Sequence, residues 1–370
     1  MDVPLFKVHM PSDVHPALRD TFASGYIAQG EKVASFEREL RRRLGTEHLV
    51  AVSDCSAAIT LALFLAGVRP GDDVITSPMC CLATNMPIAN LFARPVWCDI
   101  DPATGMLDPA RIADAVTPRT RAVLAFHWSG DVADLGALHA AAQAHGLKLV
   151  ADASEAFGAR WRGKSLGTLD SHFTVYSFGA VRHITSGDGA ALVTASAEDL
   201  ALAERLRRYG IDRSSFRLQS GDINPASDIP LAGYYFPMNN IEAAIGLAQL
   251  PYADAILARH QDNGRYFETA LAGIPGITRL VRRGDAQSAY WTYSLRAERR
   301  EDLLRKLHQE GIGAQRLHLR NDLYSCFSAS AGRTLAGVDR FDAENVAIPC
   351  GWWLSAADRE RIVEVIRSGW

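Results

Sequence analysis

The sequence predicts an α/β protein built around a mostly parallel β-sheet with helices on both faces. In the first half of the chain, short apolar runs alternate with helical stretches, in the order expected of successive β-α-β units. These runs are continuously apolar, which is typical of strands buried on both faces. Beyond residue 290 a similar mixture returns on a smaller scale, which indicates a second, smaller α/β unit.

The larger unit is expected to contain a seven-stranded sheet. The strands are expected at residues 48–53, 73–78, 95–101, 122–128, 147–154, 172–178 and 189–195. Helices are expected at residues 56–68, 83–92, 135–146 and 197–210. Ser56 is placed to cap the first of these helices and Gly146 to end the third.

The rest of the chain predicts the smaller unit. Residues 211–232 are rich in Ser, Asp and Pro and are expected to be irregular, and a long helical region follows from residue 239 to about 272. The remaining expected elements are a strand at 290–297, a charged helix at 299–310, the segment 312–319 and a terminal helix at 355–369. We therefore expect a large domain over residues 1–250 and a small C-terminal domain over residues 251–370.

Composition excludes several classes of protein. The chain has 370 residues, of which 48% are hydrophobic and 22% charged, with a net charge of −3. This is enough apolar material for a core, and it lacks the basic excess of nucleic-acid or membrane-surface binders. Six cysteines are too few for a disulfide scaffold, no signal peptide is visible, and the longest apolar stretch, about residues 57–68, is too short to span a bilayer. A cytoplasmic protein with no nucleic-acid or membrane partner is expected.

Polar residues follow several of the expected strands. Ser53 to Ser56 lie between a strand and the start of a helix, where backbone N–H groups bind phosphate well. Asp152 and Ser177 end two further strands. In an open parallel sheet, ligands bind beyond the carboxyl ends of the strands, so these residues are consistent with a phosphorylated cofactor. A carboxylate at a strand end could also serve only to cap a helix.

Six segments, in order along nearly the whole chain, carry a resemblance to a known family. They are GYIAQGEKVASFEREL (25–40), AVSDCSAAITLAL (51–63), residues 74–101, VADASEAFGARWRGKSLGTL (150–169), YSFGAVRHITSGDGA (176–190) and GYYFPMNNIEAAIGLAQL (233–250). The chain resembles the DegT/DnrJ/StrS sugar aminotransferases of the fold-type-I pyridoxal-phosphate superfamily. The resemblance implies an aspartate-aminotransferase-like α/β fold and a B6 coenzyme.

The resemblance also implies contacts to the coenzyme. Asp152 is expected to pair with the pyridine nitrogen, which keeps the ring protonated and electron-accepting. Ser177 and the amides of Cys55 and Ser56 are expected at the phosphate. Glu155 occupies the family's glutamine position near the ring hydroxyl.

Two further positions match the family's pattern. Cys81 stands where the family places a flat residue over the ring. Tyr235 stands where the family's partner subunit supplies an asparagine to the phosphate, which implies a homodimer with shared active sites.

The main departure is at the position of the family's Schiff-base lysine, which is Arg182 here. None of the five lysines, Lys7, Lys32, Lys148, Lys164 and Lys306, lies in this loop. A guanidinium stays protonated and cannot supply a neutral amine. The coenzyme, pyridoxamine or pyridoxal 5′-phosphate, is therefore expected to bind non-covalently.

One branch of the family, the keto-sugar 3-dehydratases, also lacks this lysine and carries histidine in a His-His-Ile-Thr run. Residues 182–185 are similar to that run, with arginine in place of the first histidine. His183 is the candidate base, because imidazole titrates near neutral pH. Arg182 is the candidate clamp for a phosphate or carboxylate. A hydrogen-bonded loop role for His183, and a solvent or salt-bridge role for Arg182, stay open.

Three functions remain open. The first is a pyridoxamine-phosphate-dependent elimination, such as dehydration, on a nucleotide-linked keto sugar; the second is aminotransferase-like chemistry on an atypical substrate; the third is a non-catalytic relative that binds a ligand or partner. Arg205, Arg207, Arg208 and Arg213 are candidates for meeting a nucleotide diphosphate, or form a solvated helix face. No metal site is expected, although Cys55, Cys80 and Cys81 would share one pocket.

Overall fold

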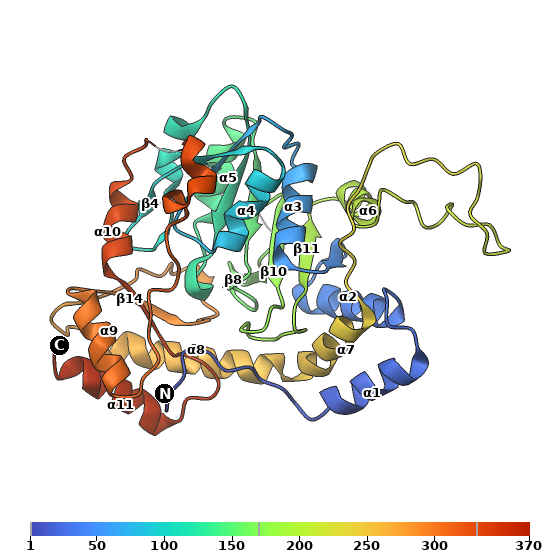
Figure 1. Ribbon diagram of the computed structural model, residues 1–370. Helices are drawn as coiled ribbons and strands as arrows, with labels where there is room; N and C mark the ends of the chain where they lie inside the picture. Colours follow the sequence, from blue (N-terminus) through green and yellow to red (C-terminus); the bar gives the residue numbers. More distant parts are fainter. Residues whose placement is uncertain (1, 169–170, 331) are drawn as a thin grey trace.

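The computed structural model describes residues 2–168, 171–330 and 332–370; Leu169, the last residue of the segment 150–169, lies outside them. It confirms the predicted fold class, because a seven-stranded sheet runs through the larger part of the molecule (Figure 1). The strands across this sheet are, in order, β1 (Leu49–Val52), β11 (Ala190–Thr194), β10 (Phe173–Ser177), β7 (Lys148–Asp152), β6 (Thr120–Phe126), β2 (Asp73–Thr76) and β3 (Arg94–Trp97).

The strand directions bring several strand ends to one edge of the sheet. Only β11 runs against its neighbours, β1 and β10, whereas the other recorded pairs are parallel. Asp152 ends β7 in the middle of the sheet, opposite Val175 of β10 and Phe126 of β6. The residues that follow β1, β2, β6, β7 and β10 therefore surround this carboxyl group.

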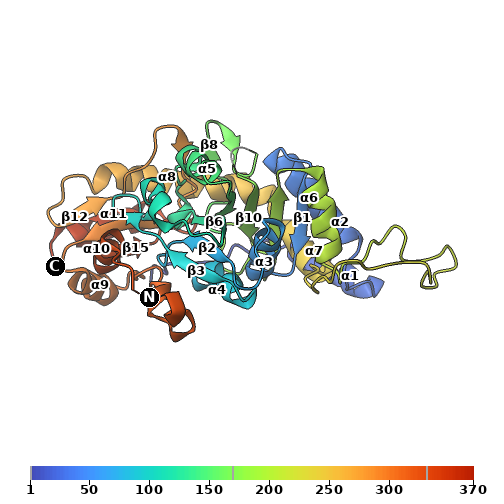
Figure 2. The same cartoon turned by 90° about the horizontal axis from the view of Figure 1, so that it is seen from above.

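Alternate side chains of each strand enter two different cores. In β1, Leu49 and Ala51 belong to one core, and Val50 and Val52 belong to the other. This explains the continuous apolar runs in the sequence, since both faces of the sheet are covered. Figure 2 shows α3 and α4 on one side of the sheet and α5 and α8 on the other.

The helices of the larger part agree with most of the expected positions. They are α1 (Val14–Ser24), α2 (Glu31–Leu44), α3 (Cys55–Leu65), α4 (Leu82–Asn90), α5 (Leu135–Gln143), α6 (Ala197–Leu206) and α7 (Asn240–Gln249). Short strands also occur outside the main sheet, at β4 (Ile100–Asp101), β5 (Met106–Leu107), β8 (Arg160–Trp161), β9 (Lys164–Ser165) and β13 (Ala286–Gln287).

The expected cap of α3 was wrong by two residues. Asp54, in an extended conformation, accepts a hydrogen bond from the Ala57 amide at 2.8 Å. Ser56 lies inside the first turn, where its hydroxyl faces the Ala83 carbonyl oxygen at 3.5 Å. The prediction that Gly146 ends α5 fits the structure. Gly146 follows the last residue of α5, Gln143, by three positions and adopts a φ of 66°, a conformation that favours glycine.

A third core lies in the C-terminal part. It packs around the antiparallel sheet of β12 (Ile277–Arg279), β14 (Tyr293–Ala297) and β15 (Asn345–Ile348). The helices of this part are α8 (Ala253–Ala270), α9 (Arg300–Gln309), α10 (Ala336–Glu344) and α11 (Ala356–Arg367). The segment 312–319 forms neither helix nor strand, and its β-type pairing is limited to single bridges, Ile312 with Val3 and Gln315 with Ala347. Division of the chain at residue 250 stays a prediction.

The longest helical run among the described residues comprises α7 and α8. By length and composition, Asn240–Ala270 is apolar enough to cross a membrane, although core helices of soluble proteins also meet this criterion. In the structure α7 packs against α1 and α2. The run is therefore weak evidence for a membrane span.

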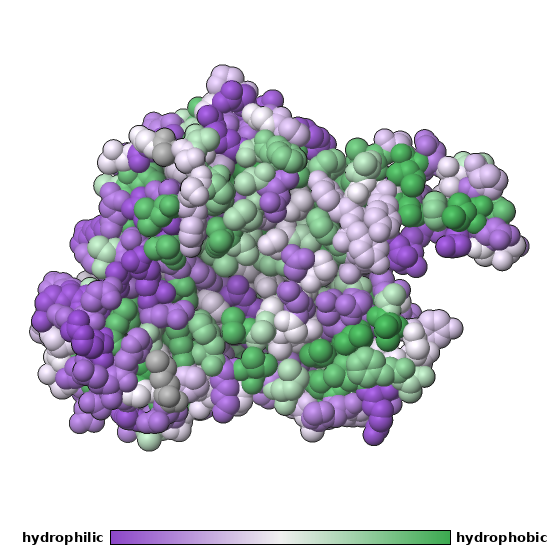
Figure 3. Space-filling view, in the orientation of Figure 1, coloured by the Kyte–Doolittle hydropathy of each residue, from purple (hydrophilic) through white to green (hydrophobic). Residues whose placement is uncertain are grey.

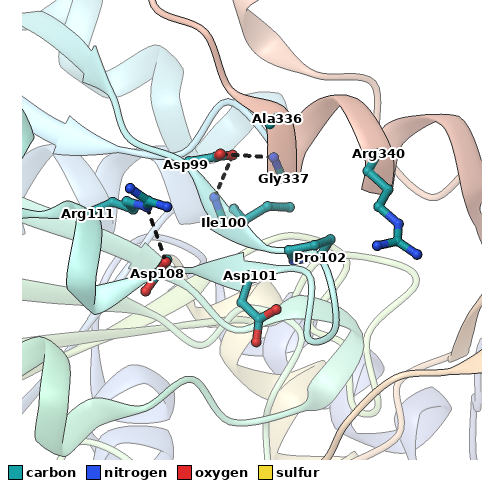
Figure 4. A pocket seen from close by; sticks show the side chains of 9 residues that line it. All are labelled: Asp99, Ile100, Asp101, Pro102, Asp108, Arg111, Ala336, Gly337 and Arg340. Atoms are coloured by element: carbon teal, nitrogen blue, oxygen red, sulfur yellow. Dashed lines mark hydrogen bonds and ion pairs between the residues drawn. The ribbon is translucent and has the colours of Figure 1, made fainter.

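Asp99 joins the larger part to α10 (Figure 4). The first turn of α10 has no side-chain cap from its own N-cap residue, Leu335. Instead, the Asp99 carboxylate accepts hydrogen bonds from the amides of Gly337 and Val338, both at 2.9 Å, and from its neighbour Ile100. A carboxylate at a helix N-terminus satisfies free N–H groups and complements the helix dipole.

We predict that Asp99→Ala lowers the free energy of unfolding by about 1–3 kcal/mol, because two amides of α10 lose their acceptor. Chemical denaturation would measure this change. Asp20→Ala provides the matched control, because Asp20 is exposed and its ion pair with Arg19 spans 3.9 Å; we expect a change within about 0.5 kcal/mol. Equal effects of the two substitutions would contradict the role assigned to Asp99.

Candidate active site

Asp152 is fully buried at the end of β7. One carboxylate oxygen accepts a hydrogen bond from the Thr84 hydroxyl of α4 at 2.7 Å, and the other accepts from the Ser154 amide at 2.9 Å. Burial raises the pKa of Asp152, while these hydrogen bonds and the charge of Arg182 act in the opposite direction. A carboxylate in such a dry position fits a cationic N–H partner, as a protonated pyridine ring would provide.

Three cysteine thiols lie around this carboxyl group. Cys55 begins α3, and Cys80 and Cys81 precede α4. Burial raises the pKa of each thiol, and the negative charge of Asp152 raises it further. The thiols are therefore neutral and weakly nucleophilic at physiological pH. Across residues 2–168, 171–330 and 332–370, no three His, Cys, Asp or Glu side chains are grouped to hold a metal ion.

The predicted phosphate contacts come from two elements. Helix α3 begins at Cys55 and Ser56, so its first-turn amides face the space beyond the sheet edge. Ser177 ends β10, and its buried hydroxyl accepts a hydrogen bond from the Gly179 amide at 3.2 Å. Asp54 already places a carboxylate at the start of α3, which adds negative charge beside these amides.

Glu155 brings three distant segments together. It is fully buried, and one of its oxygens accepts a hydrogen bond from the Ser129 amide at 2.7 Å. Its other oxygen, Oε1, lies 3.5 Å from the Arg182 guanidinium and 2.8 Å from Nε2 of His318. Ser129 follows β6, Arg182 follows β10 and His318 belongs to the C-terminal part. Glu155 therefore contacts all three segments.

Arg182 is held within the site. Only 12% of its side chain is exposed. Its guanidinium lies 4.4 Å from the centre of the Trp291 ring, and the Trp291 indole donates a hydrogen bond to the Val181 carbonyl at 2.7 Å. Phe6 stacks on the same indole at 4.9 Å. Arg182 therefore forms a salt bridge with the Glu155 carboxylate, and its role as a clamp for a phosphate or carboxylate stays a prediction.

His183, the adjacent residue, has different surroundings. It is buried, its Nε2 lies 3.0 Å from the Ala289 carbonyl oxygen, and its ring contacts the His260 ring at a centroid distance of 4.6 Å. Burial lowers the pKa of His183 well below its ordinary value, and the neighbouring charges of His260 and Arg182 lower it further. The contacts recorded for His183 are with Ala289 and His260 rather than with Asp152 or Glu155, and its role as the base stays a prediction.

Tyr235 is not brought to these residues within one chain. Its side chain is 57% exposed, and its ring stacks on Tyr209 at 5.0 Å. Tyr209 and Tyr235 flank residues 211–232 in the sequence, and Figure 1 shows this segment standing away from the body of the molecule. Its contact with a partner's coenzyme stays a prediction.

Sequence reasoning missed several residues that build the site. Thr84 carried a weak signal, because it lies in the first turn of an expected helix beyond a strand end. His318 carried no local signal, since it is separated from Glu155 by 163 residues and belongs to a segment without regular structure. Trp291 was visible only as part of an expected strand.

Comparisons with known proteins agree with this geometry. The model of the DegT/DnrJ/EryC1/StrS aminotransferase family matches residues 10–367. The spore coat polysaccharide biosynthesis protein SpsC of Bacillus subtilis is 34% identical over 285 residues, which are 76% of this chain and 72% of SpsC. Two crystal structures are similar over the whole chain, both with a TM-score of 0.94. They are the sugar aminotransferase CalS13 from Micromonospora echinospora, 36% identical and fully covered, and AtS13 from Actinomadura melliaura, 35% identical and 99% covered.

The buried histidines predict an acid-sensitive fold. Burial lowers the pKa of His260 to about 4 in the folded protein. Between about pH 6.5 and pH 4, His260 is therefore protonated in the unfolded chain but neutral in the folded chain. We expect this residue alone to reduce the free energy of unfolding by about 3 kcal/mol as the pH falls from 6.5 to 4. Denaturation at a series of pH values would measure this loss.

His260→Gln should weaken the pH dependence without abolishing it, because burial also lowers the pKa of His127 to about 4. At neutral pH this variant should be less stable, because the bond between His260 Nδ1 and the Tyr290 carbonyl, 2.8 Å long, is lost. If the free energy of unfolding of His260→Gln depended on pH as it does in the wild type, His260 would have no part in acid stability.

Proposed function

The chain belongs to the DegT/DnrJ/EryC1/StrS aminotransferase family, and from this premise we propose that it is a B6-dependent enzyme of deoxysugar biosynthesis that binds its coenzyme without a covalent bond. The coenzyme class of the family is pyridoxal or pyridoxamine 5′-phosphate. The proposed substrate is a nucleotide-linked keto sugar. The proposed reaction is an elimination such as dehydration, in a cytoplasmic homodimer.

The proposal is supported by the partners of the site residues, because among the described residues no lysine has a recorded hydrogen bond or ion pair with Asp152, Glu155 or Ser177. Arg182, in the loop where the resemblance places the family's lysine, is paired with Glu155. Lys148 begins β7, at the opposite end from Asp152, and Lys306 hydrogen-bonds to Ser368 and Gly369. A guanidinium cannot replace a neutral amine as nucleophile or proton carrier.

The residues present otherwise fit a B6 coenzyme. The buried Asp152 would hold the ring nitrogen, and Ser177 with the amides of Cys55 and Ser56 would hold the phosphate. Glu155 would lie near the ring hydroxyl. When bound, the coenzyme supplies an electron sink for the reacting carbon.

Cys81 is the proposed neighbour of the ring face, where a neutral, polarisable thiol is compatible with a flat ring. Burial raises the pKa of this thiol, which keeps it uncharged.

A cavity beside α6 supports the nucleotide linkage. It has a volume of about 650 Å³, and its lining includes Arg205, Arg207 and Arg213 together with the acidic Glu204 and Asp212. Burial lowers the pKa of Arg213, and the charges of Arg208 and Arg207 lower it further, so these cations crowd one another. A diphosphate would relieve that repulsion. Arg207 also pairs with Glu37 at 2.6 Å, which fixes one wall of the cavity.

The exposed apolar surface supports a homodimer. Figure 3 shows apolar residues gathered over α1 and α7. Phe22, Tyr26 and Ile27 are exposed there, beside a cavity of about 560 Å³. Residues 211–232 stand away from the body (Figure 1) and expose Ile223 and other apolar side chains. A second copy of the chain would cover such surfaces and bring Tyr235 to a neighbouring site.

A second candidate is amino transfer to an atypical sugar. It is supported by CalS13, which is described as a sugar aminotransferase and matches the whole chain at 36% identity. Transfer from an amino donor would still require a proton carrier other than lysine.

The test is to incubate the purified protein with pyridoxamine phosphate and a nucleoside-diphosphate 4-keto-6-deoxy sugar, and to follow the sugar by mass spectrometry. We predict loss of the substrate by elimination of a hydroxyl group, without a need for glutamate. A product that has gained an amino group only when glutamate is present would favour the aminotransferase. Failure to bind either B6 phosphate in calorimetry would contradict both and favour a non-catalytic relative.

A further inference from the structure

The contact between Glu155 and His318 determines which ring nitrogen of His318 carries hydrogen. An ionised carboxylate only accepts hydrogen bonds, and Oε1 of Glu155 lies 2.8 Å from Nε2 of His318. Nε2 must therefore donate. In the neutral ring, the lone pair is then on Nδ1, the nitrogen that points away from Glu155.

The His318 ring is also held in place. The rings of Phe126 and Trp128 meet it nearly edge to face, at centroid distances of 5.8 and 5.5 Å. The second oxygen of Glu155 is fixed by the Ser129 amide at 2.7 Å. The His318 side chain keeps 14% of its surface exposed, so the ring is oriented but reachable.

The buried carboxylate of Glu155 faces both His318 and Arg182. Its Oε1 lies 2.8 Å from Nε2 of His318 and 3.5 Å from the Arg182 guanidinium. The contacts recorded for His183 are instead with the Ala289 carbonyl oxygen and the His260 ring. Of the two histidines, His318 is therefore the one that a carboxylate orients.

We propose that His318, oriented by Glu155, removes the proton from the reacting carbon in place of the missing lysine amine. This inference rests on the proposed function. The C–H bond breaks, its proton goes to Nδ1 of His318, and its electron pair expels the hydroxyl group as the C–O bond breaks. The hydroxyl oxygen then takes the proton from Nδ1, so that one water leaves and the ring is restored.

The first test needs no coenzyme. Long-range ¹H–¹⁵N spectra of the protein labelled in its histidines, recorded about two pH units above the ordinary imidazole pKa, would show which nitrogen of His318 bears hydrogen. The His318 signal is identified by its loss in His318→Gln. We expect hydrogen on Nε2 in the wild type, and a mixture of both forms in Glu155→Gln, because an amide can donate as well as accept. Hydrogen on Nδ1 in the wild type would overturn the proposal.

The second test measures proton transfer. In deuterated water with pyridoxamine phosphate and a nucleoside-diphosphate 4-keto-6-deoxy sugar, reversal of the C–H cleavage before the hydroxyl group leaves places deuterium on the reacting carbon, and His318→Gln should slow this exchange about 100-fold or more. Its affinity for pyridoxamine phosphate should stay within about threefold of the wild-type value, because no coenzyme contact is assigned to His318. His145→Gln, at an exposed histidine, is the matched control and should exchange at the wild-type rate.

The outcomes separate the inference from the function on which it rests. Wild-type exchange in a folded His318→Gln protein, with the coenzyme bound, would overturn the role of His318 and leave the B6 function intact. A wild-type protein that neither binds pyridoxamine phosphate nor exchanges would contradict the B6 function and the inference together. Should His318→Gln fail to fold, Glu155→Gln should shift the pH dependence of exchange, and an unshifted profile would overturn the proposal.

Discussion

The site depends on the buried carboxylate of Glu155. A charged group without solvent is costly unless it is paired, and Glu155 is paired through Ser129, Arg182 and His318. These partners come from the loop after β6, the loop after β10 and the C-terminal part of the chain. The carboxylate therefore both joins the two parts of the molecule and sets the charges at the edge of the sheet where Asp152 lies.

This arrangement links two departures from the family's pattern. The resemblance places a lysine at residue 182 and a glutamine at residue 155, whereas this chain has arginine and glutamate. The Arg182 side chain is only 12% exposed, and Glu155 places an opposite charge 3.5 Å from its guanidinium. The two residues at these positions therefore form one ion pair at the edge of the sheet. The added carboxylate also gives His318 a fixed acceptor.

Much of the fold could be predicted because its signals are local. Continuous apolar runs marked the strands, and Asp152 and Ser177 were identified from their positions at strand ends. The cap of α3 was missed because Asp54 and Ser56 are both good caps, and only the backbone conformation separates them. Adjacent residues can have different partners, as Arg182 and His183 do, and no periodicity in an irregular loop reveals this. His318 meets Glu155 only through the tertiary fold, across 163 residues.

We propose that the site binds a B6 coenzyme that no residue of the chain tethers. The most direct test of this untethered binding is mass spectrometry of the protein incubated with one equivalent of pyridoxal phosphate, under native conditions and then after borohydride reduction and denaturation. Arg182→Lys serves as the positive control for a reducible bond. We expect one coenzyme per wild-type chain in the native spectrum and none after reduction and denaturation. A wild-type chain that still carries one coenzyme after reduction and denaturation, bound covalently to a single lysine, would contradict untethered binding.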